Sequence, residues 1–110
     1  MDDRIIKEIL KFRDERGWKQ FHNPKDLAIS ISLEVAELLE NFQWSSSEEA
    51  VAKRMSSIQE ELADVLIYSI LFAETVGLNL DEIIMDKLSA NNKKYPVEKA
   101  FGKKEKYTEL

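Results

Sequence analysis

Two apolar stretches decide the fold of this chain: Leu27-Ala-Ile-Ser-Ile-Ser-Leu-Glu-Val-Ala-Glu-Leu-Leu-Glu-Asn-Phe42 and Ile58-Gln-Glu-Glu-Leu-Ala-Asp-Val-Leu-Ile-Tyr-Ser-Ile-Leu-Phe-Ala73. Each contains two carboxylates three residues apart, Glu34 with Glu37 and Glu61 with Asp64. At this spacing both side chains of a pair lie on one face of a helix, about one turn apart. Because the other faces are mostly Leu, Ile, Val, Ala and Phe, we expect both helices to be largely buried.

Each of the two helices carries one narrow polar stripe. The stripes continue the carboxylate pairs at helical spacing: Ser30, Glu34, Glu37 and Asn41 on the first helix, and Ser57, Glu61, Asp64 and Tyr68 on the second. If the stripes face each other, four carboxylates converge where water is scarce, and each unpaired charge there costs roughly several kcal/mol. Neither stripe contains Lys or Arg, so a divalent cation is expected, and oxygen ligands favour Mg²⁺, Mn²⁺ or Ca²⁺ over zinc or copper.

Other interpretations of the carboxylate pairs are less specific. Carboxylates three residues apart are common on solvated helix faces, and one pair alone would indicate no more than that. A di-iron carboxylate bundle needs two Glu-x-x-His motifs. The single histidine of the chain, His22, lies in a connector instead. From the residues alone, a shared divalent-cation site and two solvated acidic faces both remain open.

The composition limits the class of protein. The 110 residues predict one domain over 1–110, with 97–110 as a C-terminal tail that is flexible or docked on a neighbouring subunit. A net charge of −5 argues against a general nucleic-acid-binding surface. The absence of Cys excludes disulfides and thiolate catalysis. The charged N-terminus and the short apolar run from Val65 to Ala73 predict neither a signal peptide nor a membrane span, so we expect a cytoplasmic protein.

Apolar periodicity and capping residues predict an all-α protein, a four-helix bundle that completes its core by association. The expected helices are Asp3 to Arg16, about Pro24 to Phe42, about Ser57 to Val76, and Leu80 to a stop before Pro96. A short extra helix through Arg54 and a bend at Ser56-Ser57 are expected between the second and third. Asn23 before Pro24 indicates a helix start, and Gly77 indicates a helix end.

Aromatic and basic residues outside the two stripes suggest contacts to a ligand. Trp18, Phe21, His22 and Trp44 flank the second helix, where they either pack at the bundle ends or line a pocket that stacks on a planar ligand. Lys87, Asn91 and Tyr95 recur at one-turn spacing along the fourth helix, with Lys94 beside them. They could reach phosphates, or the lysines could simply favour the helix C-terminus.

The chain resembles a known family, the all-α nucleoside triphosphate pyrophosphohydrolases of the MazG-like group, and within it the dCTP pyrophosphatase branch. The motifs that carry the resemblance cover nearly the whole chain: Trp18-x-x-Phe21-His22-x-Pro24, Leu33-Glu34-Val-Ala-Glu37-Leu with Phe42-Gln43-Trp44, Glu60-Glu61-Leu-Ala-Asp64-Val-Leu-Ile-Tyr68, Asn91-x-x-x-Tyr95-Pro96, and Lys106-Tyr-Thr-Glu-Leu110. The wider group often has a second acid next to the first glutamate, where this chain has Leu33. The dCTP branch lacks that acid too.

The resemblance implies a function and a set of site residues. Glu34, Glu37, Glu61 and Asp64 match the family's catalytic Mg²⁺-binding carboxylates, with Mn²⁺ as a possible substitute. The substrate would be a nucleoside triphosphate, cut between the α and β phosphates to give a monophosphate and pyrophosphate in housecleaning of the nucleotide pool. By the same resemblance, the substrate-contacting residues are Trp18, His22, Trp44, Tyr68, Lys87, Asn91 and Tyr95. The family forms homodimers or homotetramers.

The general base cannot be assigned from the sequence, although Glu37 is preferred among the four carboxylates. Lys87, with a basic residue of a neighbouring subunit, would stabilise the departing pyrophosphate. The alternative from a different class is a non-enzymatic helical oligomer with a structural divalent-metal site.

Overall fold

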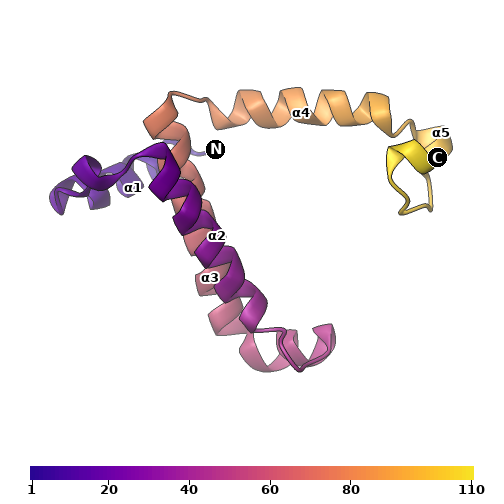
Figure 1. The fold of residues 1–110 in the computed structure, drawn as a ribbon, viewed down its shortest axis with the longest axis horizontal. Helices are drawn as coiled ribbons and strands as arrows, with labels where there is room; N and C mark the ends of the chain where they lie inside the picture. The colour runs from indigo at the N-terminus through magenta and orange to yellow at the C-terminus, as the bar shows by residue number, and fades with distance from the viewer. The chain divides into compact units, whose positions relative to one another are not determined.

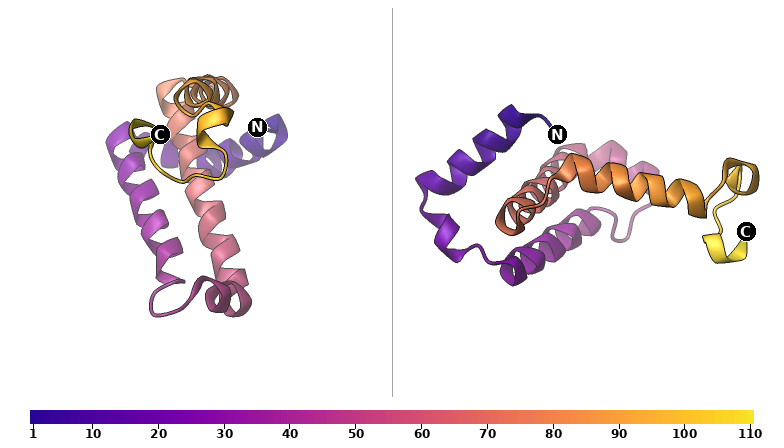
Figure 2. Two further views of the ribbon diagram at one scale, coloured as in Figure 1. Left: turned by 90° about the vertical axis from the view of Figure 1, so that its right-hand side faces the viewer. Right: turned by 90° about the horizontal axis from the view of Figure 1, so that it is seen from above.

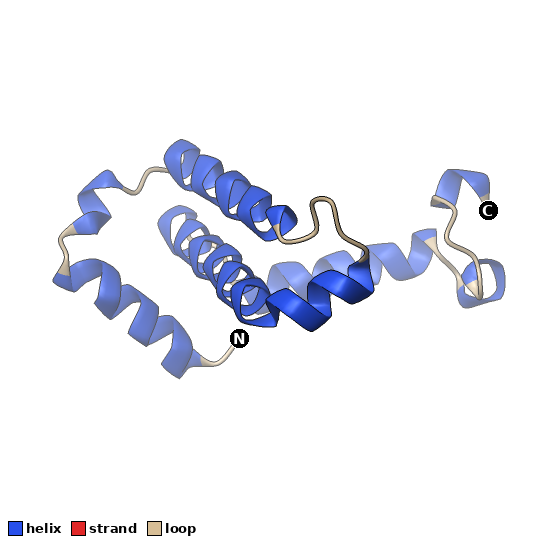
Figure 3. Ribbon diagram, turned by 90° about the horizontal axis from the view of Figure 1, so that it is seen from below, coloured by secondary structure: helices blue, strands red, loops and turns tan.

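A computed structural model describes all 110 residues, and every regular element in it is helical (Figures 1 and 3). The elements are α1 (Asp3–Glu15), η1 (Trp18–Phe21), α2 (Pro24–Glu40), α3 (Ser47–Val76), α4 (Leu80–Lys94), α5 (Val97–Ala100) and η2 (Tyr107–Glu109). The predicted all-α class with four main helices is therefore confirmed. The chain forms two compact units, Met1–Leu78 and Asn79–Leu110.

Helices α2 and α3 form an antiparallel hairpin in the first unit (Figure 2, left). The loop after α2 closes the hairpin. Helix α1 packs against α3, and η1 connects α1 to α2. Small and branched apolar side chains form the core: Leu27, Ala50, Ile70, Leu71 and Ala73. Leu27, at the start of α2, is only 1% exposed. This scaffold brings carboxylates of α2 and α3 together.

The predicted burial of α2 and α3 is wrong for an isolated chain. Leu33 is 60% exposed and Leu39 is 67% exposed, and Leu62 and Leu66 on α3 are exposed as well. The reason is geometric, because three helices in one unit can cover only the inner faces of a hairpin. Large exposed apolar faces mark surfaces that bind other molecules.

The helix ends follow the capping signals of the sequence. Asn23 accepts a hydrogen bond from the backbone N–H of Asp26 at 2.9 Å, and Asn79 caps α4 in the same way. Gly77 ends α3 in a left-handed conformation with φ of 73°, which glycine adopts without steric cost. The predicted starts at Pro24 and Leu80 and the predicted end at Val76 are confirmed.

A kink in α3 lies at Arg54, two residues before the bend expected at Ser56-Ser57. Its φ of −124° and ψ of 25° are not helical, and the short helix expected through Arg54 merges with the following one. The Nη1 atom of Arg54 donates to the carbonyl oxygen of Asn41 at 2.8 Å and to Oγ of Ser45 at 2.9 Å. These bonds tie the kink to the loop, which explains why the backbone departs from helical geometry at Arg54.

The second unit, Asn79–Leu110, contains α4 and the C-terminal segment. The rings of Tyr95 and Tyr107 meet edge to face with centroids 5.9 Å apart, and Lys94 lies over the ring of Tyr107. The last residues are thus docked on the end of α4. No helix in either unit is both long enough and apolar enough to cross a membrane.

Candidate metal centre and adjoining cavity

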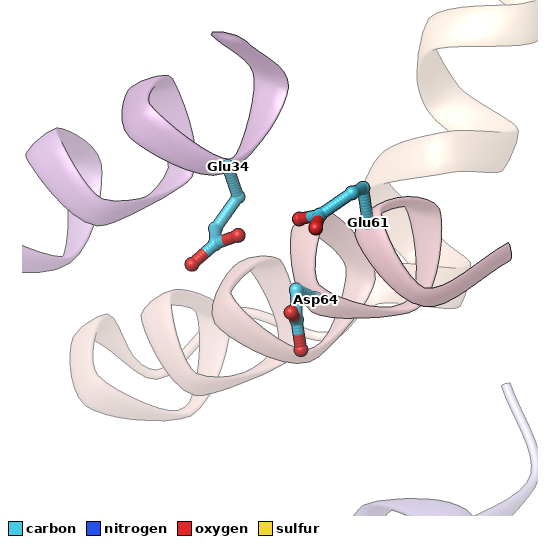
Figure 4. A group of neighbouring side chains, drawn as sticks. All are labelled: Glu34, Glu61 and Asp64. Carbon is cyan, nitrogen blue, oxygen red and sulfur yellow. The ribbon is translucent and has the colours of Figure 1, made fainter. Parts of the chain in front are cut away.

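Three of the four predicted carboxylates converge between α2 and α3. Figure 4 shows Glu34 of α2 extending toward Glu61 and Asp64 of α3. One oxygen of each residue lies within 4.8 Å of those of the other two, and all three side chains are half-buried. Such a cluster of oxygens matches the ligands that hard divalent cations bind in proteins.

The fourth carboxylate, Glu37, is more exposed and lies beside the cluster. Glu37 raises the pKa of Glu61 to about 7 through a shared hydrogen bond and its charge, with burial and the charge of Glu34 adding to the shift. Burial, followed by Glu37 and the charge of Asp64, raises the pKa of Glu34. The cluster therefore holds more negative charge than its surroundings stabilise.

The donor set fits a divalent cation. The Oε2 atoms of Glu34 and Glu61 are buried without a hydrogen-bond partner. None of the ion pairs in the structure involves the four carboxylates. Carboxylate oxygens that are shielded from water and lack a cationic partner destabilise the ionised form, and a cation with oxygen preference would satisfy them.

A cavity of about 1110 Å³ adjoins the carboxylates. Residues of α1, η1 and α3 make up most of its lining, and Glu34 and Asp64 belong to the lining as well as to the carboxylate cluster. Three of the residues expected to contact a nucleotide also line it: Trp18, His22 and Tyr68. The cavity thus joins an acidic end to aromatic walls.

The other expected nucleotide contacts are one loop residue and three residues of the second unit. Trp44, in the loop between α2 and α3, does not line the cavity. It is 93% exposed and has a left-handed backbone with φ of 63°. Lys87, Asn91 and Tyr95 belong to the second unit, where Lys87 is exposed and the other two are half-buried.

One residue of the cavity, Arg13, was not singled out by sequence reasoning. It occupies the stripe that continues Ile6 and Leu10 along α1, and it is only 7% exposed. A charged residue at the apolar spacing of an amphipathic helix was the available signal, because such a position is turned toward the rest of the protein.

The fold and the acidic cluster together define an all-α protein with a carboxylate site suited to a divalent cation. The sequence model of the MazG-like family matches residues 29–110. The chain belongs to this family.

Known relatives are similar over most of the chain. The dCTP pyrophosphatase 1 of Mus musculus is 39% identical over 105 residues, and that of Homo sapiens is 37% identical over 105 residues. Each match covers 91% of this chain but 62% of the mammalian protein, so the chain spans about three fifths of the length of these relatives. A crystal structure of a pyrophosphatase from Archaeoglobus fulgidus superposes with a TM-score of 0.82 at 44% identity, covering 86% of this chain and 91% of that one.

Proposed function

We propose that this protein hydrolyses a nucleoside triphosphate between its α and β phosphates, with dCTP or a related deoxynucleotide as substrate and Mg²⁺ as cofactor. One observation carries the proposal. Glu34 and Asp64 belong to the carboxylate cluster and also line the cavity that contains Trp18 and His22. A ligand with an aromatic ring at one end and an anionic chain at the other fits this combination. The names of the mammalian and archaeal relatives support the same chemistry.

The carboxylates would hold the cation. Glu34, Glu61 and Asp64 offer the convergent oxygens, and Glu37 lies beside two of them. When bound, Mg²⁺ neutralises charge on the phosphates and lowers the pKa of a coordinated water. A triphosphate brings several negative charges to an acidic site, so we expect substrate binding to depend on the cation.

Glu37 is our preferred general base. It is the most exposed of the four carboxylates and lies outside the group of three convergent residues. It would accept a proton from the water that attacks the α-phosphorus, while the bond from this phosphorus to the bridging oxygen breaks. The products are the nucleoside monophosphate and pyrophosphate, and Lys87 is proposed to stabilise the leaving pyrophosphate. Free nucleotides occur in the cytoplasm, which is where we place the activity.

The direct test is pyrophosphate release from a panel of nucleoside and deoxynucleoside triphosphates with Mg²⁺. Glu37→Gln and Asp64→Asn keep the shape of each side chain and remove one charge. Glu74→Gln removes one charge from the exposed C-terminal end of α3 and serves as the matched control. We expect release by the wild type and the control, and a loss of about 100-fold or more in the other two variants.

No release from any nucleotide by a folded wild-type protein would reject the proposal. A helical oligomer with a structural metal site would then be the better account of the carboxylates. Thermal stabilisation by Mg²⁺ alone does not distinguish the two, because a structural ion gives it as well.

We also propose that copies of the chain associate into a homodimer or homotetramer. The exposed side chains of Leu33, Leu39 and Leu66 support this proposal, because an isolated chain would leave them in water. Sedimentation velocity at several protein concentrations tests it. A single species with the mass of one 12.8 kDa chain at all concentrations would refute it.

A further inference from the structure

Arg13 is a buried cation in the wall of the cavity. Its Nε donates to Oδ1 of Asp14 at 2.8 Å, and the side chain of Asp14 is itself exposed. This bond holds the pKa of Asp14 below its ordinary value. The hydrogen bond to Asp14 uses one of the five N–H donors of the Arg13 guanidinium. The two Nη atoms remain, and their N–H groups form a flat edge with parallel donors.

His22 is the second polar group of interest in this wall. Its Nδ1 atom is buried and has no hydrogen-bond partner. Burial, and then the positive charge of Arg13, lowers the pKa of His22, so the imidazole is neutral at pH 7. A neutral imidazole offers one nitrogen as donor and the other as acceptor. Arg13 and His22 therefore present donors and an acceptor within one region.

The surrounding walls are suited to a planar ring. Ile9, Phe12 and Trp18 line the cavity, and the rings of Phe12 and Trp18 meet edge to face with centroids 5.6 Å apart. The remaining charged lining residues of α1 and its N-terminus are exposed to solvent: Asp2, Arg4 and Glu8. A flat heterocycle between apolar walls would have its polar edge recognised by the shielded pair, Arg13 and His22.

We infer that Arg13 and His22 recognise the Watson–Crick edge of cytosine, and that Arg13 is a specificity-determining residue of this protein. Cytosine presents two adjacent acceptors, O2 and N3, followed by an amino donor at C4. The two Nη atoms of Arg13 match the acceptors, and an unprotonated Nδ1 of His22 accepts from the amino group. In uracil and thymine the order is acceptor, donor, acceptor, so N3–H meets a donor of Arg13 and O4 meets the acceptor of His22.

The inference rests on the proposed function, because it assumes that the cavity takes the base of a nucleotide. Purines are less well matched. Adenine places its amino donor beside the acceptor N1 on one edge and beside the acceptor N7 on the other, so a fork of donors cannot pair with both positions of either edge. Guanine also presents two acceptors and a donor in a row, N7, O6 and N1–H, but its middle group projects from the ring where the N3 of cytosine is recessed, so the fork and the imidazole do not fit all three at once.

The test combines variants with altered substrates. The value of kcat/KM is measured for dCTP, dUTP and 3-deaza-dCTP, an analogue in which a C–H group replaces N3. Arg13→Met removes the fork at similar length, and Arg13→Lys keeps the charge without the fork. Lys11→Met removes one exposed charge from the same helix and is the matched control.

We expect the wild type and the control to hydrolyse 3-deaza-dCTP and dUTP about 5- to 150-fold less efficiently than dCTP, the range for one good bidentate contact to a base. Arg13→Met should reduce the rate on dCTP by a similar factor and abolish the difference between dCTP and 3-deaza-dCTP. The triphosphate of deoxyzebularine, which lacks the amino group, tests His22 in the same way. If Arg13 had a purely structural role, Arg13→Met would lower kcat/KM equally for all substrates.

Three results would overturn the inference. The wild type could hydrolyse dCTP and 3-deaza-dCTP equally well, or Arg13→Met could lose kcat/KM equally on both substrates. The third is that Arg13→Lys keeps the full preference for dCTP over 3-deaza-dCTP. The first comparison uses only the wild type, so it decides the question even if Arg13→Met does not fold. Absence of pyrophosphate release from every nucleotide would instead reject the proposed function. In that case, quenching of Trp fluorescence by dCTP and by 3-deaza-dCTP still compares their binding, and equal dissociation constants would reject the recognition of N3.

Discussion

Replacing Glu34 by Gln should change the stability of the protein in opposite directions with and without Mg²⁺. In EDTA the carboxylate of Glu34 lies near Glu37 and Asp64, has a raised pKa, and has one buried oxygen without a partner. Like-charge neighbours cost a few tenths of a kcal/mol each on a partly exposed helix, so the neutral amide should raise the unfolding free energy by about 0.5–1 kcal/mol. The amide can also donate a hydrogen bond to Glu61.

Mg²⁺ should reverse this order. A cation that binds the folded protein at a concentration 100-fold above its dissociation constant adds about 2.7 kcal/mol to the unfolding free energy. For a chain of this length, that corresponds to an increase in melting temperature of about 10 °C or more. Glu34→Gln removes one of three convergent ligands, so its melting temperature should respond only at much higher Mg²⁺ concentrations.

Differential scanning calorimetry at pH 7.5, in EDTA and across a Mg²⁺ titration, measures both effects. Glu74→Gln, which changes the net charge equally outside the cluster, should follow the wild-type curve at every Mg²⁺ concentration. An equal response to Mg²⁺ in wild type and Glu34→Gln would refute the metal centre. A lower stability of Glu34→Gln in EDTA would refute the argument that the carboxylates repel each other.

Three further predictions concern the cluster and the loop near it. In EDTA the unfolding free energy should fall as the pH rises from about 4.5 toward 7, because the folded chain retains protons on Glu61 and Glu34 that the unfolded chain loses. Melting curves between pH 4.5 and 8 should show a shallower slope in Glu61→Gln than in the wild type. Arg54→Met leaves the buried carbonyl group of Asn41 without its donor, so chemical denaturation should show an unfolding free energy lower by about 2–3 kcal/mol. A decrease below about 0.5 kcal/mol would contradict this account. Trp44→Gly removes an exposed side chain from a left-handed backbone, so the unfolding free energy should stay within about 1 kcal/mol of the wild type. In the same variant, a rise in KM for dCTP would show that Trp44 contacts the substrate, and an unchanged KM would exclude that contact.

The carboxylate cluster could be predicted from the sequence because much of its geometry is local. Glu34 and Glu37 lie on one helix face by spacing alone, and the same holds for Glu61 and Asp64. Only the facing of the two stripes needed tertiary structure, in which α2 and α3 form an antiparallel hairpin. The structure brings three of these carboxylates into one cluster.

Features that depend on contacts between distant residues could not be predicted in this way. The place of Arg13 in the apolar stripe of α1 indicates that it faces the rest of the protein, but its burial in the cavity wall follows from how α1 and η1 pack beside α3. The kink at Arg54 was expected at two serines, because the hydrogen bonds from Arg54 to the loop are not visible in local propensity. The aromatic character of Trp18 and Trp44 could not show that only Trp18 lines the cavity.

The loop contacts of Arg54 also bear on the chemistry, because they fix the register of the hairpin. Glu34 lies seven residues before Asn41 along α2, and Glu61 lies seven residues after Arg54 along α3, so the bond between Arg54 and Asn41 sets these two carboxylates opposite each other. On α2, seven residues are close to two helical turns, about 10 Å, which keeps Glu34 on the same side of the helix as Asn41. A slip of one residue on either helix would rotate a carboxylate by about 100° away from the cluster. The part-buried hydrogen bond from Arg54 to Asn41 is directional, so it constrains the placement of the carboxylates in a way that non-directional hydrophobic contacts alone would not.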